Sequence, residues 1–83
     1  MKQTMTRKEV FEEIETERGF QATLGHDHDH TVAEFLLIIE RELQEAKDGW
    51  MKNKPQRHSA MSEIMQIAAV CVAAMEQHGV DGN

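Results

Sequence analysis

Cysteine, proline and aromatic residues are scarce in this sequence, which has one Cys, one Pro and no Tyr. An intrachain disulfide needs two cysteines, so the fold must be stabilised without one. Cys71 stands in an apolar run and is predicted to be a small buried hydrophobic residue. No apolar run reaches membrane-spanning length, so we expect no membrane partner. Polar and charged N-terminal residues, in place of a signal peptide, predict a cytoplasmic protein.

Basic residues are also few, with 9 Lys and Arg against 15 Asp and Glu and a formal net charge of −6. An acidic surface repels phosphate backbones, so binding to a nucleic acid polymer is not expected. Acidic side chains are, however, the ligands that Mg²⁺ or Mn²⁺ requires. The 83 residues are predicted to form a single domain, 1–83, whose core is modest unless a metal or oligomerisation supplements it.

The pattern of apolar residues predicts an all-α fold. Helices are expected at about residues 6–20, 31–50 and 59–78, followed by a frayed tail at 79–83. No convincing strand pattern is present, and three helices joined by short loops make a helical bundle.

Capping signals bound these helices. Gly19 weakens the end of the first helix, Gly49 fits a C-terminal stop for the second, and Gly79 is suited to the residue after the third. The expected N-cap residues are Thr6 (with Glu9 in a capping box), Thr31 (with Glu34 in a second one) and Ser59.

Each of the last two helices has an apolar stripe that predicts an ordinary core face. Both stripes follow from a helical projection at about 100° per residue. On the second helix the stripe contains Val32, Leu36, Ile39, Leu43 and Ala46, and on the third helix it contains Ala60, Ile64, Ile67, Cys71 and Ala74.

The third helix also has a second apolar face. A helix that is apolar nearly all round must be buried nearly all round, which three short helices do not achieve alone. We therefore predict a homo-oligomer, a dimer or tetramer, that packs largely through this helix. The alternative is that the first helix folds over this face, although its apolar stripe is narrow. The second face is formed by Met61, Met65, Ala68 and Val72.

Two pairs of oxygen-bearing side chains border the apolar stripes. Glu42 and Glu45 are three residues apart on the second helix, and Glu63 and Gln66 are three apart on the third. Residues at this spacing are neighbours on a helix surface, so two antiparallel helices would present all four to one site. Carboxylate and amide oxygens are hard ligands, which predicts a Mg²⁺ or Mn²⁺ site. The alternative is two ordinary solvated helix faces.

Residues 38–46 (IIERELQEA) followed by 62–76 (SEIMQIAAVCVAAME) resemble the small MazG-like proteins common in phage and bacterial genomes. The resemblance covers about residues 12–79, and its most specific part is the run E-x-x-Q-[IV]-A-A-V after an E-x-x-E helix. It implies an all-α fold that assembles as dimers or larger oligomers. It also implies a Mg²⁺-dependent hydrolase that splits nucleoside triphosphates into monophosphate and pyrophosphate.

The family pattern is E-E-x-x-E followed by E-x-x-D. On this pattern Glu42, Glu45 and Glu63 are the implied catalytic and metal-binding residues, and Gln66 stands where the family has Asp. Arg41 stands where the family has its first Glu. The small subgroup often has Gln at the Asp position, but together these changes remove two carboxylates and should lower metal affinity. A catalytically weak or inactive protein that sequesters a nucleotide in the same pocket is therefore the alternative function. A structural interaction module built on the Met and Ala face is a third.

A basic segment between the second and third helices contains the only tryptophan. The functional interpretation is nucleotide binding, with a base stacked on Trp50 and phosphates held by the cations, including Arg41. The alternative is that Trp50 packs the end of the helix and the cations are solvated. The candidate substrate-binding residues here are Trp50, Lys52, Lys54 and Arg57.

Alternating His and Asp residues at 26–30 also suggest a Zn²⁺ or Ni²⁺ site. The alternative, which we favour, is a polar loop that helps to cap the helix beginning at Thr31. A spacing of two residues within a loop imposes no ligand geometry.

Overall fold

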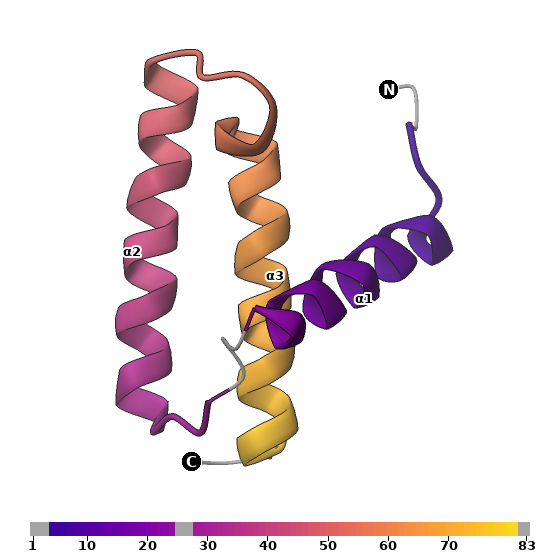
Figure 1. Ribbon diagram of the computed structural model, residues 1–83, viewed down its shortest axis with the longest axis vertical. Coiled ribbons are helices and arrows are strands. Elements are labelled where there is room, and N and C mark those ends of the chain that lie inside the picture. Colours follow the sequence, from indigo (N-terminus) through magenta and orange to yellow (C-terminus); the bar gives the residue numbers. More distant parts are fainter. Residues whose placement is uncertain (1–3, 25–27, 82–83) are drawn as a thin grey trace.

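Three α-helices form the protein, a computed structural model of which describes residues 4–24 and 28–81 (Figure 1). The elements are α1 (Arg7–Thr23), α2 (Val32–Met51), the short 3₁₀ helix η1 (Gln56–His58) and α3 (Ala60–His78). α2 and α3 form an antiparallel hairpin, and α1 packs across α3 (Figure 1). The all-α prediction is confirmed, and the described residues contain no strand. None of the described helices is long and apolar enough to cross a membrane.

The helices begin where the capping signals predict. Thr6 Oγ1 accepts from the Glu9 amide at 3.1 Å, while the Thr6 amide donates to Glu9 Oε1 at 2.8 Å. Thr31 and Glu34 repeat this capping box with the same two distances, 3.1 and 2.8 Å. Hydrogen bonds from the threonine backbone lower the pKa of both glutamates. Ser59 caps α3, so each N-terminus satisfies otherwise unpaired amides with its own side chains.

The helices end within a few residues of the predicted positions, but two of the three glycines expected at these ends do not stop their helices. α1 continues past Gly19 as far as Thr23, and Gly49 lies inside α2 rather than at its stop. A Cβ atom at Gly49 would lie 2.4 Å from the His58 carbonyl oxygen, because the connection to α3 crosses the helix at this point. Gly49 is therefore needed for a close backbone approach, while Gly79, at φ 75°, ends α3 as predicted.

The core is small and built largely from alanine. Its buried apolar residues are Phe35, Ala46, Ala69 and Ala73. The Phe35 ring meets the rings of His30 and His78 edge-on, at centroid distances of 5.3 and 5.9 Å. Gln77 accepts from the His30 amide at 2.9 Å and donates to the His28 carbonyl at 2.8 Å. These contacts attach the start of α2 to the end of α3.

α1 is attached less firmly than the hairpin helices are to each other. None of its residues is buried, and its backbone approaches α3 but, within the described part of the chain, not α2. The Arg18 guanidinium forms an ion pair with Glu76 on α3, with an Nε–Oε1 distance of 2.7 Å. α1 therefore forms one side of the molecule and leaves a space between itself and α2.

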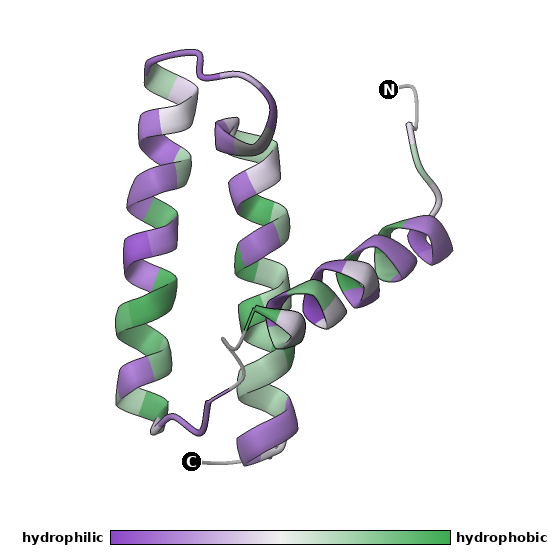
Figure 2. Cartoon of the chain, in the orientation of Figure 1, coloured by the Kyte–Doolittle hydropathy of each residue, from purple (hydrophilic) through white to green (hydrophobic). Residues whose placement is uncertain are grey.

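The apolar stripes predicted as core faces are only partly buried in the single chain. Val32, Leu36, Leu43 and Ile64 are exposed, although Ala46 is buried as predicted. The other buried apolar residues, Phe35, Ala69 and Ala73, lie outside these stripes. Figure 2 shows the resulting spread of apolar residues over both hairpin helices, with polar residues over their connection.

Candidate functional site

A cavity of about 760 Å³ opens between α1 and the hairpin. Side chains from all three helices and both connections surround it, so it depends on the complete fold. One end is rich in carboxylates and the other in apolar and aromatic side chains. α1 and its C-cap residue contribute Glu17, Phe20, Gln21 and Leu24. The following connection and α2 contribute His28, His30, Phe35, Ile38, Arg41, Glu42 and Glu45, and the rest of the chain contributes Lys54, His58, Glu63, Gln66, Val70 and Ala73.

Three carboxylates converge at one end of this cavity. Each of Glu42, Glu45 and Glu63 has a ligand oxygen, and these oxygens all lie within 4.8 Å of one another. Glu63 is only 4% exposed, and its Oε2 atom, like Oε2 of Glu42, is sheltered from solvent without a hydrogen-bond partner. A buried carboxylate oxygen without a partner is costly, so this arrangement favours a cation as the missing partner.

The local fold explains how these carboxylates meet. Glu42 and Glu45 lie one turn apart on α2 and point to the side of the hairpin on which α1 packs. Glu63 is in the first turn of α3, where the helix dipole favours negative charge. The connection that Gly49 allows to cross so closely brings this turn beside the middle of α2.

Close packing of like charges changes the acidity of the cluster. Burial, together with the charge of Glu45 and the interaction with Glu63, raises the pKa of Glu42 to about 7. Burial also raises the pKa of Glu63, while the interaction with Glu42 and the Lys54 charge oppose this rise. The cluster therefore retains a proton near neutral pH when no cation neutralises it.

We expect the metal-free protein to lose stability as pH rises from about 5 to 7. The pKa of Glu42 is about 7 in the folded chain but near 4.5 when unfolded, so the folded state binds more protons in this window. The loss should be on the order of 1–2 kcal/mol after solvent screening is taken into account. Thermal unfolding in the presence of a chelator measures it, and Glu42→Gln should remove it. A melting temperature that rises over this pH range in wild type would contradict the expectation.

Three further residues predicted for the site also line the cavity. Gln66, which is half-buried, and the exposed Lys54 and Arg41 each contribute to its lining. The Arg41 side chain is 82% exposed, and its Nε lies 3.9 Å from Glu45 Oε1. The cavity thus has three carboxylates, one amide and two cations near one end.

The tryptophan is not part of the cavity. Trp50 is 79% exposed and neither it nor Lys52 lines the cavity, so stacking of a base on Trp50 in this cavity is not supported. Packing of Trp50 on the end of its helix is also wrong for the single chain. The side chain of Arg57 lies outside the described residues.

The structure describes only part of the histidine segment, residues 28–30. His26 and Asp27 lie outside the described residues, as do Gly82 and Asn83 of the predicted frayed tail. His28 and His30 line the cavity. Among the residues that the structure describes, the group with metal-binding spacing is Glu42, Glu45 and Glu63, and no histidine joins it.

Sequence reasoning missed the contribution of α1. Its four lining residues recur at spacings of three and four, which is one helical face, so a projection of this helix would have revealed them. These lining residues are Glu17, Phe20 and Gln21 of α1 and its C-cap residue Leu24. His58, which belongs to the basic segment between the second and third helices, also lines the cavity.

The residues that carry the MazG-like resemblance are the ones that the fold assembles. Glu42, Glu45, Glu63 and Gln66 all line the cavity, and Arg41 lies at its edge. The family assignment itself stays a prediction. Comparisons with protein-family models, curated proteins and solved structures found no match.

Proposed function

We propose that this protein is a Mg²⁺- or Mn²⁺-dependent nucleotide pyrophosphohydrolase. It would cleave a nucleoside triphosphate or a related nucleotide to the monophosphate and pyrophosphate. The observation that carries the proposal is the nearly buried Glu63 carboxylate, whose free oxygen converges with Glu42 and Glu45 on one end of a cavity. The resemblance of these residues to the MazG-like motifs supports the reaction class.

The carboxylates fit a hard divalent cation. Three oxygens within 4.8 Å of one another would repel strongly if all three groups were ionised, and a cation removes this repulsion. Glu42, Glu45 and Glu63 would hold the ion, and the Gln66 amide oxygen would contact it or its water. Such an ion neutralises phosphate charge and lowers the pKa of bound water.

The protein's own residues would then orient the phosphates and accept a proton. Water attacks the α-phosphorus, the bond to the bridging oxygen breaks, and pyrophosphate leaves. A carboxylate oxygen of the cluster that does not hold the ion would accept the proton that the water loses. Lys54 and Arg41 line the same region and would contact phosphate oxygens.

The other end of the cavity would hold the base and sugar. Phe35 is two helical turns from Glu42 along α2, a distance of about 10 Å. Phe20 of α1 and Leu24, the C-cap residue of α1, are half-exposed and lie on the opposite wall, beside the Gln21 amide. This apolar end favours a flat organic group, and it replaces Trp50 as the proposed site of the base.

A nucleotide-sequestering protein is the second candidate function. Arg41, 3.9 Å from Glu45, offsets part of the negative charge that a cation needs, and Gln66 contributes no charge. Both features weaken metal binding more than they weaken capture of a phosphate. We also propose that either activity belongs to a homo-oligomer, because much apolar surface of α2 and α3 is exposed in the single chain.

The decisive experiment is a panel of nucleoside triphosphates incubated with the purified protein and Mg²⁺ or Mn²⁺. We expect pyrophosphate and the matching monophosphate in equal amounts, with no product when the metal is chelated. Calorimetric titration of the same nucleotides gives binding separately. Binding without turnover would favour the sequestering protein, and neither binding nor turnover would contradict both candidates.

Arg41→Glu should distinguish an enzyme weakened by arginine from a protein that uses arginine to hold its ligand. In the first case the new carboxylate adds a cation ligand at the cavity edge, so Mg²⁺ binding tightens and turnover rises. In the second, loss of a charge-assisted hydrogen bond weakens nucleotide binding by about 1.5–3 kcal/mol. We expect the first result, because three carboxylates already converge. Unchanged affinities for both ligands would show that Arg41 is simply solvated.

A further inference from the structure

The carboxylate end of the cavity also carries two permanent positive charges. Arg41 Nε lies 3.9 Å from Glu45 Oε1, and both side chains line the cavity. Lys54 lines it from the connection between α2 and α3. Burial raises the pKa of Glu63, and the Lys54 charge opposes this rise, so the ammonium lies near that carboxylate. The three carboxylates are therefore flanked by cations from two different parts of the chain.

The backbone of the connection fixes the place from which Lys54 reaches the cavity. Asn53 and Gln56, on either side of Lys54 and Pro55, both have left-handed backbones, with φ of 50° and 51°. The Lys54 amide donates to the Gly49 carbonyl at 2.9 Å. A glutamine at positive φ is uncommon and persists only where the surrounding structure requires it. Lys54 is therefore presented by a constrained turn and not by a freely moving loop.

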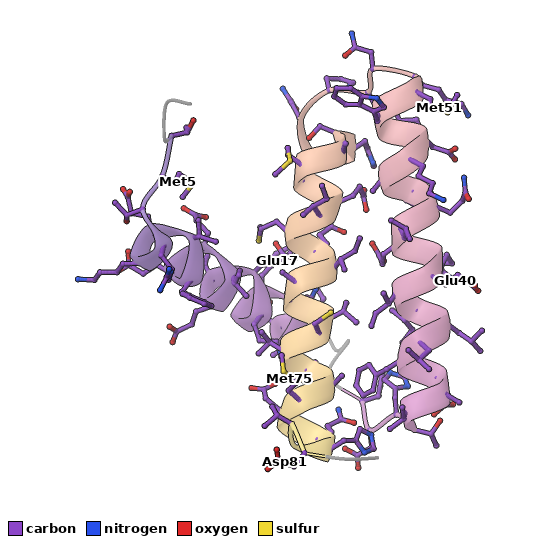
Figure 3. The ribbon with its side chains drawn as sticks, turned by 180° about the vertical axis from the view of Figure 1, so that it is seen from behind. Met5, Glu17, Glu40, Met51, Met75 and Asp81 are labelled. Carbon is purple, nitrogen blue, oxygen red and sulfur yellow. The ribbon has the colours of Figure 1, made fainter. Side chains whose placement is uncertain are left out.

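The acidic ligands are too few for two divalent ions. The ions of a two-metal site lie about 3.5–4 Å apart and together carry four positive charges. Among the residues that the structure describes, three carboxylates meet within 4.8 Å, and the neighbouring Gln66 has no charge. Glu17 of α1, labelled in Figure 3, also lines the cavity but does not belong to this group. A second ion would lack carboxylates of its own and would be repelled by Arg41 and Lys54.

We propose that the site holds one divalent cation, and that Arg41 and Lys54 supply the positive charge that a second ion supplies in a two-metal site. The nearly buried Glu63, whose Oε2 has no hydrogen-bond partner among the described residues, would hold the ion with Glu42 and Glu45. Positive charge from an ion and two side chains fits a ligand with several adjacent anionic oxygens, such as a polyphosphate chain. This inference rests on the proposed function for its metal and its phosphates, but not on turnover.

The number of bound ions tests this inference directly. Calorimetric titration of the full chain with Mn²⁺ should give one ion per chain, and the electron paramagnetic resonance spectrum should show isolated Mn²⁺ without exchange coupling. Arg41→Glu adds a fourth carboxylate beside Glu45 and removes a repelling charge, so this variant should bind a second Mn²⁺ ion. Lys47→Glu is the matched control, because it reverses the same charge at an exposed position of α2 that does not line this cavity. It should still bind one ion.

Inorganic pyrophosphate tests the part that the side-chain cations take. With saturating Mn²⁺, Lys54→Met should bind pyrophosphate about 10- to 100-fold more weakly than wild type, which is the range for one hydrogen bond to a charged group. Lys52→Met is the matched control, because Lys52 is an exposed lysine two residues away that does not line the cavity. Its affinity for pyrophosphate should equal that of wild type.

The outcomes separate this inference from the proposed hydrolase. Two Mn²⁺ ions on the wild-type chain, no second ion on Arg41→Glu, or equal losses of pyrophosphate affinity in Lys54→Met and Lys52→Met would each overturn it, even if nucleotides were cleaved. One ion and pyrophosphate binding that depends on Lys54, without nucleotide turnover, would support it and contradict only the hydrolase. The absence of any bound ion would overturn both. Circular dichroism verifies that each variant is helical, and the wild-type ion count and the two lysine variants still decide if Arg41→Glu does not fold.

Discussion

Glu63→Gln is expected to abolish metal-dependent stabilisation and to lower turnover at least about 100-fold. The amide keeps the size of the side chain but removes the buried charge that a cation would neutralise. For the same reason the metal-free variant should be more stable than wild type, by about 1–2 kcal/mol at neutral pH. Thermal unfolding with and without Mg²⁺ or Mn²⁺ measures both effects, because a ligand that binds only the folded state raises the melting temperature.

Glu40→Gln provides the control for this experiment. Glu40 is exposed on the outer side of α2 and is labelled there in Figure 3, away from the three carboxylates. Glu40→Gln removes the same formal charge as Glu63→Gln, so a general effect of net charge would appear in both variants. If Glu63→Gln kept the full metal response, the cation site would have to lie elsewhere, and the pyrophosphohydrolase mechanism based on this cluster would be wrong.

The largest effect on stability is expected from Gly49→Ala. The added methyl group would lie 2.4 Å from the His58 carbonyl oxygen and 3.1 Å from the Ala60 amide nitrogen, and backbone atoms move aside only at a cost. We expect the free energy of unfolding to fall by about 2–3 kcal/mol, as for overpacking elsewhere. Denaturant titration measures this, and weaker metal binding should accompany it because Glu63 follows this crossing.

Gly19→Ala is the matched substitution in α1. A Cβ atom at Gly19 has no neighbour within 4 Å, and alanine favours helix over glycine, so this variant should gain about 0.5–1 kcal/mol. The same chemical change is therefore expected to have opposite signs at two helical positions. Destabilisation by similar amounts at both would show that the crossing at Gly49 has room for a side chain.

Local signals in the sequence were sufficient to predict the helices. The capping boxes at Thr6 and Thr31 act within four residues, and the structure contains both. Gly49 was misread because a glycine near a helix end has two explanations. Whether such a glycine ends the helix or allows another segment to cross it closely depends on residues that are distant in the chain. A local sequence pattern does not include these residues.

The candidate site could be predicted in part for a related reason. The convergence of Glu42, Glu45 and Glu63 could be predicted, because helical spacing and an antiparallel hairpin can both be inferred from the sequence. The α1 wall was missed because its position depends on how α1 crosses α3, which has no local signature. The core faces were predicted only in part, because Val32, Leu36, Leu43 and Ile64 of the apolar stripes are exposed. Ala46 of the α2 stripe is buried, together with Ala69 and Ala73, which lie outside the stripes.

The loose attachment of α1 has a consequence for how a ligand would be held and released. α1 contacts α3, without a buried residue of its own, yet it supplies the apolar wall of the cavity. A bound nucleotide would bridge α1 to α2 and so add a connection that the described chain lacks. Part of its binding free energy would then be used to order α1, which lowers affinity but eases product departure. The helix that recognises the ligand would also be the region whose amide hydrogen exchange slows most when the cavity is filled.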